Sequence, residues 1–104
     1  MNIDSIRPPD DIIVDALCAL NGEITPSMRM VALRYRYDEA KFRFYMAEEP
    51  TDDERENAEI VAVNFESLIS HKLRKLDLEF VVTSEPFGKL DTLDFVIFAR
   101  SESV

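Results

Sequence analysis

The sequence predicts a small α+β domain in which two helices pack on one face of a four-stranded antiparallel sheet. The chain has 104 residues, an ordinary length for one domain, so we expect residues 1–104 to share a single core. Apolar residues recur at helical spacing in two segments and alternate with polar residues in four others. The resulting order is α-β-β-α-β-β, which favours two antiparallel hairpins separated by a helix.

The first helix is expected to begin at Asp10, because the two prolines before it are tolerated at a helix start. One apolar stripe runs along it, made of Ile12, Ile13, Ala16, Leu17 and Leu20. Asn21-Gly22 predicts its end, since both residue types accept the left-handed conformation of a C-terminal cap. Cys18 is expected near the core face of this helix as a buried, inert thiol.

The apolar period changes from helical to alternating between residues 31 and 46, which predicts two strands. One face carries Val31, Leu33, Tyr35, Tyr37, Phe42, Phe44 and Met46. The other carries Ala32, Arg34, Arg36, Lys41, Arg43 and Tyr45. Asp38-Glu39-Ala40 between them is short enough for a hairpin loop, so an antiparallel pair is expected.

The second helix has a clear start signal in Thr51-Asp52-Asp53-Glu54. The Thr51 hydroxyl can accept a hydrogen bond from the amide three residues on, while the Glu54 side chain reaches back to the Thr51 amide. The helix is expected to run to about Ser70. Its core-facing stripe is Ala58, Val61, Ala62, Phe65, Leu68 and Ile69.

Residues 76–83 and 93–100 alternate in the same way, with a turn-rich connection between them, so we expect a second hairpin. Its outer face would be partly apolar through Val81, Val96 and Phe98. A binding partner or a second copy of the chain, in a homodimer, would cover such a face.

Composition excludes several classes of function. Twelve basic and 21 acidic residues give a net charge of −9, which repels nucleic acid and anionic membranes. No apolar run approaches the roughly 20 residues of a membrane-spanning helix, and the N-terminus lacks a secretory signal, so we expect a cytoplasmic protein. One cysteine and one histidine cannot build a zinc site, and no phosphate-binding loop is present, so no metal, cofactor or catalytic residue is predicted. His71 is expected to be a surface residue at a helix end.

Acidic residues gather where the second helix begins, and they are the predicted partner surface. Residues 48–70 carry eight carboxylates and one arginine, a net charge of −7, whereas residues 28–47 carry five basic and two acidic side chains, or +3. The candidate contacts are Glu48, Glu49, Asp52, Asp53 and Glu56, with Asp10 and Asp11 as weaker candidates. Such a cluster can dock on the Lys/Arg surface with which a nuclease holds its substrate. The same residues also suit the solvated start of a well-capped helix.

The chain resembles small bacterial immunity proteins, the antidotes of contact-dependent growth inhibition and related polymorphic toxin systems. The resemblance is carried by the Glu-Ile-Thr-Pro-Ser-Met-Arg connection at residues 23–29, the aromatic and charged hairpin, the acidic helix start and a closing Phe-Ala-Arg strand. It implies a protein that binds the C-terminal domain of a cognate toxin and blocks its active site or substrate surface. Such toxin domains are often nucleases, commonly acting on tRNA. The connection at residues 86–93 is more extended than the compact form typical of these proteins.

Two other functions stay open at this stage. A homo-oligomeric structural or adaptor domain could join through the outer sheet face. A small enzyme using a pair of carboxylates would need burial to separate their pKa values, and the acidic helix start is hydrated. We therefore expect a non-enzymatic immunity protein that binds a basic toxin domain.

Overall fold

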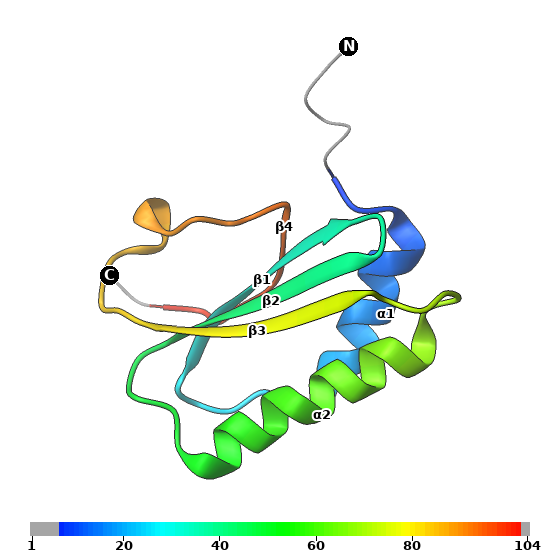
Figure 1. Cartoon of the computed structure of the whole chain (residues 1–104). Coiled ribbons are helices and arrows are strands. Elements are labelled where there is room, and N and C mark those ends of the chain that lie inside the picture. Colours follow the sequence, from blue (N-terminus) through cyan, green and yellow to red (C-terminus); the bar gives the residue numbers. More distant parts are fainter. Residues whose placement is uncertain (1–6, 103–104) are drawn as a thin grey trace.

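The computed structural model describes residues 7–102, and its elements follow the order that the sequence predicts (Figure 1). They are α1 (Asp10–Leu20), β1 (Met28–Arg36), β2 (Glu39–Met46), α2 (Asp52–Leu68), β3 (Lys75–Val82), the short 3-10 helix η2 (Phe87–Lys89) and β4 (Phe95–Ala99). Residues 1–6, which were judged to lack a secretory signal, are outside the described part of the chain.

The sheet is mixed, so the prediction of a wholly antiparallel sheet was wrong. Its strand order is β3-β2-β1-β4, in which β1 is antiparallel to β2 and to β4, while β2 and β3 are parallel. The predicted second hairpin does not form, because β3 and β4 lie at opposite edges. The physical reason is the helix between β2 and β3. After β2 ends, α2 carries the chain back to the other end of the sheet, so β3 runs in the same direction as β2.

The connection at residues 83–94 therefore has to pass from one edge of the sheet to the other (Figure 1, yellow to orange). It does so over the outer face, where the Tyr45 hydroxyl donates to the Asp91 carbonyl at 2.7 Å. Met30, Ala32 and Tyr45, whose side chains belong to this face, are buried. The chain itself thus covers part of the face on which the sequence placed a partner or a second copy.

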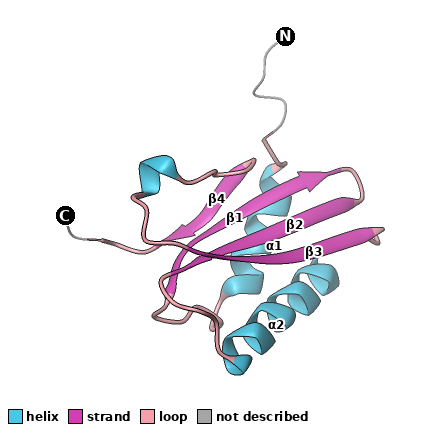
Figure 2. Cartoon of the chain, turned by 60° about the vertical axis from the view of Figure 1, so that its left-hand side comes forward, coloured by secondary structure: helices cyan, strands magenta, loops and turns pink. Residues whose placement is uncertain are grey.

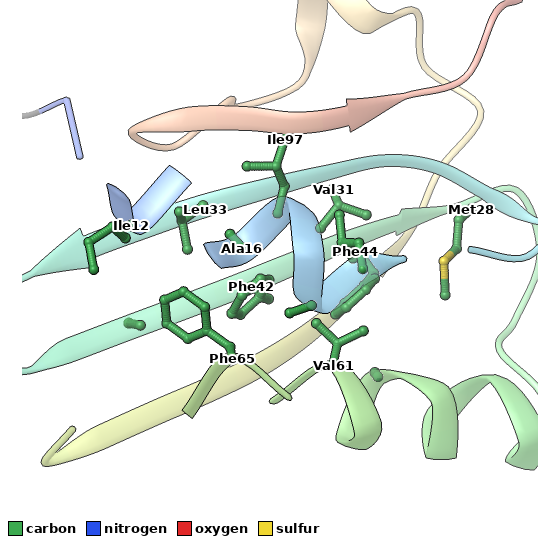
Figure 3. Close-up of a cluster of buried hydrophobic side chains, with 14 of the residues drawn as sticks. Ile12, Ala16, Met28, Val31, Leu33, Phe42, Phe44, Val61, Phe65 and Ile97 are labelled. Carbon is green, nitrogen blue, oxygen red and sulfur yellow. The ribbon is translucent and has the colours of Figure 1, made fainter. Parts of the chain in front are cut away.

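The helices pack on the opposite face, and the core lies between them and the sheet (Figures 2 and 3). The Phe65 ring of α2 meets the Phe42 ring edge-on, with 5.2 Å between ring centroids, and Phe44 stacks on Phe80 at 5.4 Å. The labelled core residues from both helices and three strands are Ile12, Ala16, Met28, Val31, Leu33, Phe42, Phe44, Val61, Phe65 and Ile97. The alternating and helical stripes predicted this core correctly.

Several side chains depart from the predicted faces, among them Tyr37, which lies in the turn between β1 and β2 and is 91% exposed. Cys18 is exposed, so the expectation of a buried thiol was wrong, and Leu17 is 46% exposed. The cause is that α1 centres its narrow buried face on Ala16, and each further residue turns by about 100° around a helix. Leu68 at the end of α2 is 47% exposed. Phe98 packs against the core instead of the outer face, because a register shift in β4 interrupts the alternation.

Candidate functional site

The junction where β2 leads into α2 lies at one end of the sheet (Figure 1). Five exposed carboxylates occupy this junction. We call them the acidic segment: Glu48, Glu49, Asp52, Asp53 and Glu56. The first two lie in the connection and the others in the first two turns of the helix. The structure thus brings together all five residues that the sequence singled out most strongly.

The start of α2 is held rigidly by the predicted capping box. The Glu54 amide donates to the Thr51 hydroxyl at 3.1 Å, and the Thr51 amide donates to the Glu54 carboxylate at 3.0 Å. The other carboxylate oxygen accepts a 2.6 Å hydrogen bond from the Thr25 hydroxyl. The pKa of Glu54 is lowered, mainly by this hydrogen bond from Thr25 and to a smaller extent by the bond from the Thr51 amide. Glu54 therefore ties the helix start to the connection between α1 and β1.

The carboxylates of the acidic segment are available to a partner. Glu49 forms one ion pair with Arg55 at 3.3 Å, and the Arg55 guanidinium also lies over the Phe80 ring. Within residues 7–102, Glu48, Asp52, Asp53 and Glu56 form no ion pair. The positive end of the helix dipole stabilises carboxylates in the first turn of α2, so an isolated protein tolerates this concentration of charge.

Asp10 and Asp11 lie at the other end of the molecule. Asp10 begins α1 and pairs with Arg7 at 2.8 Å. Tyr35, whose pKa is raised by burial and then by the charge of Asp11, is 2.9 Å from His71, just beyond the end of α2. Asp11 is therefore near the end of α2, whereas the acidic segment surrounds its start. The structure does not join the two groups of candidates into one surface.

One buried arginine, for which the sequence predicted no role of its own, has a structural role. Arg29 is 5% exposed and donates to both carboxylate oxygens of Glu102, at 2.9 and 3.0 Å. It also donates to the carbonyls of Thr83 and Glu85, each at 2.8 Å. Hydrogen bonds from Arg29 lower the pKa of Glu102 to about 2. Arg29 thus links residue 102 and the start of the crossing connection to β1 through hydrogen bonds. No local sequence pattern predicts this role.

A second charged region lies on the outer sheet face, near the turn between β1 and β2. It is a cavity of about 200 Å³, which we call the cationic pocket. Its charged lining residues are Arg34, Arg36, Glu39, Lys41, Lys75 and Asp77. They come from β1, β2 and β3, so the pocket exists only once the sheet has formed. The sequence placed three of its cations on one face of a hairpin but predicted no site there.

Other chemistry is sparse in the described part of the chain. A groove of about 550 Å³ between the end of α1 and β4 is mostly apolar, with Leu17, Cys18, Ile24 and Phe98 among its lining residues. Residues 7–102 contain no group of three or more His, Cys, Asp or Glu side chains placed to hold a metal ion. None of the helices described for this chain has the length and apolar character needed to cross a membrane.

A comparison with known families accounts for nearly the whole chain. The family model of the MafI2 immunity protein matches residues 9–102, from just before α1 to the end of the described residues. The expectation of a small bacterial immunity protein family is thereby confirmed. No curated protein matches the chain significantly.

Proposed function

The chain belongs to the MafI2 immunity protein family, and we propose that it protects its own cell by binding and neutralising the C-terminal domain of a cognate toxin. The match over residues 9–102 is the observation that carries this proposal, because it includes every element from α1 to β4. We further propose that the toxin domain is a basic nuclease. Contact-dependent growth inhibition or a related system would deliver it.

The charge of the acidic segment supports a partner of opposite sign. A nuclease holds the phosphate backbone on lysine and arginine side chains, and carboxylates fixed on a rigid helix start can occupy the same side chains. Attraction between opposite charges also speeds the encounter of two proteins, by roughly 10- to 1,000-fold at low salt. An inhibitor that must capture its toxin before damage occurs benefits from this rate.

Inhibition of this kind requires no catalysis, metal or cofactor from the immunity protein. The chain acts as one folded surface that covers the active site or the substrate surface of the toxin, in the cytoplasm where the toxin would otherwise reach its substrate. A tight complex leaves little free toxin, and a Kd in the nanomolar range corresponds to about −12 kcal/mol. Each toxin molecule therefore consumes one immunity protein.

The proposal is tested with the toxin domain encoded in the neighbouring gene. Cells that express this domain should survive only when the chain is co-expressed. With purified proteins, nuclease activity should fall linearly with added chain and reach zero at one equivalent. Full inhibition by a small fraction of one equivalent would instead indicate an enzyme that destroys the toxin. No protection and no inhibition would refute the proposed function.

A homodimer through the outer sheet face stays a prediction. Residues 83–94 already cover part of that face, which leaves less area for a second copy. Light scattering across a range of concentrations, with and without the toxin domain, would decide between a monomer and a dimer.

A further inference from the structure

The register of the central strands places two cations directly opposite each other. Arg34 of β1 is the cross-strand partner of Lys41 of β2, and both side chains belong to the outer sheet face. Like charges directly opposite each other in a sheet are destabilising. The isolated protein therefore carries an unfavourable pair at the floor of the cationic pocket.

Only one of these two cations has a carboxylate partner within the described residues. Lys41 lies 3.7 Å from Glu79, while the Arg34 side chain forms neither an ion pair nor a hydrogen bond with any residue in the range 7–102. The Arg34 Nε atom is also buried without an acceptor. A buried donor without an acceptor is rare in folded proteins and costs free energy.

The other cations of the pocket already have partners. Arg36 donates to Asp94 at 2.8 and 3.1 Å, and Lys75 lies 3.7 Å from Asp77. Among the cations of the pocket, Arg34 is therefore the one that has no carboxylate partner within the described residues.

A carboxylate is the group that best fits this arrangement. Guanidinium presents its N–H groups in a planar fork that matches the two oxygens of a carboxylate. Phosphate shares this chemistry, but a nucleic-acid strand would bring many charges toward a chain of net charge −9. Asp77 and Glu39 also line the pocket, so it suits one small anion and not a polyanion.

We propose that the cationic pocket receives an Asp or Glu side chain of the toxin domain, whose carboxylate is bound by Arg34 with Lys41 alongside. This inference rests on the proposed function, since the toxin supplies the carboxylate. It assigns the toxin a second kind of contact, opposite in charge to the one at the acidic segment.

Both regions border β2, so a single partner has to extend along most of this strand to contact them. Lys41 and Glu48 are seven residues apart along β2 and its extension, which spans roughly 23 Å at about 3.3 Å per residue. An interface that buries about 800 Å² on each partner is roughly 30 Å across. Contacts of opposite charge at its two ends would fix the orientation of the toxin, because a reversed complex would bring like charges together.

The test compares Arg34→Gln with a matched control, Lys72→Gln. Both variants remove one positive charge, but Lys72 is exposed, lies after α2 and forms no ion pair within residues 7–102. Affinity for the purified toxin domain and stability against urea are measured for each. We expect Arg34→Gln to weaken binding by at least about tenfold, mainly through faster dissociation, without loss of stability. Lys72→Gln should bind within about twofold of the wild type, and Arg34→Lys should recover part of the loss because it keeps the charge without the fork.

The outcomes separate the inference from the proposed function. If Arg34→Gln binds and inhibits the toxin like the wild type, the pocket inference is wrong and the immunity role stands. If Arg34→Gln loses stability along with affinity, Arg34 is structural and the inference is also wrong. If the wild-type chain fails to bind the toxin, both proposals fail. Binding of a single-stranded oligonucleotide by the wild type but not by Arg34→Gln would assign the pocket to phosphate and overturn the carboxylate.

Discussion

The acidic segment and the cationic pocket are two charged regions that the fold treats in opposite ways. The acidic segment is contiguous in sequence and lies at a helix start, where the dipole of α2 favours negative charge. The cationic pocket is assembled from three strands, and the register of β1 and β2 sets Arg34 against Lys41. The first charge cluster suits its position in the free protein, whereas the second is disfavoured by its position.

This difference shows that a charge cluster needs its own structural explanation before a function is inferred from it. The acidic segment has one, since carboxylates stabilise a helix start with or without a partner. Lys41 is paired with Glu79, but Arg34 has no partner within the described residues, so we attribute its position to an external anion. The predictions below test the two regions against each other.

The largest effect is expected from reversing the acidic segment. Replacing all five of its carboxylates with lysine should slow association with the toxin domain by about 100-fold at low salt, because steering between opposite charges is lost. The dependence of the association rate on ionic strength should also disappear. Stopped-flow measurements at two salt concentrations provide the test, with Glu59→Lys/Glu66→Lys as a control farther along α2. Equal association rates for the wild type and the reversed variant would exclude this segment from the partner surface.

A smaller effect is expected at Glu54, which should stabilise the helix start without contributing to binding. Glu54→Gln removes charge-assisted bonds from Thr25 and Thr51 and should cost about 1 kcal/mol of stability at pH 7. The pKa of Glu54 is lowered in the folded state, so its contribution is full above the unfolded value of about 4.3 and is lost as pH falls through the folded value.

Urea unfolding between pH 7 and pH 2 checks this linkage. The wild type should lose its advantage over Glu54→Gln progressively below about pH 4.3. Glu102, whose pKa is about 2, contributes to the acid slope of both proteins and therefore cancels in the comparison. A constant difference in stability across the whole range would contradict the role of Glu54. A loss of toxin affinity by the folded variant would extend the partner surface to this residue.

The smallest effect is expected in the free protein at the cationic pocket. Removing the positive charge of Arg34 by Arg34→Gln should raise the free energy of unfolding by about 0.2–1 kcal/mol, because the like-charge pair with Lys41 is relieved. High salt screens this repulsion, so the gain should shrink as ionic strength rises. Urea unfolding at two salt concentrations measures it. A destabilised variant would show that Arg34 supports the sheet and is not held for a partner.

Local sequence patterns predicted the elements well but not their pairing. The capping box at Thr51 and Glu54, the β1–β2 hairpin and most of the core stripe of α2 depend on residues close together in the chain and are confirmed, whereas Leu68 of that stripe is exposed. The alternation of apolar and polar residues in β3 and β4 predicts which face of each strand is apolar, but it does not predict which strand each of them pairs with. A strand that follows β2 through a helix favours a parallel crossover, and this rule would have indicated the pairing of β2 with β3 but not the place of β4 beside β1.

The same limit applies to the candidate sites. The acidic segment could be identified because its members are neighbours in the sequence. Arg34 and Lys41 lie opposite each other because a two-residue turn at residues 37–38 sets the register, and the predicted loop at residues 38–40 would not have paired them. The contribution of Lys75 needs the parallel pairing of β2 with β3. The pairing of Arg29 with Glu102 joins residues 73 positions apart and has no local signal at all.

The central claim is that one toxin domain contacts both charged regions, and two-dimensional nitrogen–proton NMR of the labelled chain tests it most directly. On addition of unlabelled toxin domain, we predict that the largest shifts fall on the amides of residues 48–56 and on the Nε–H of Arg34. The amides of Asp10 and Asp11, near the far end of α2, should shift less. A complex that forms while the resonances of either charged region stay unchanged would contradict the account.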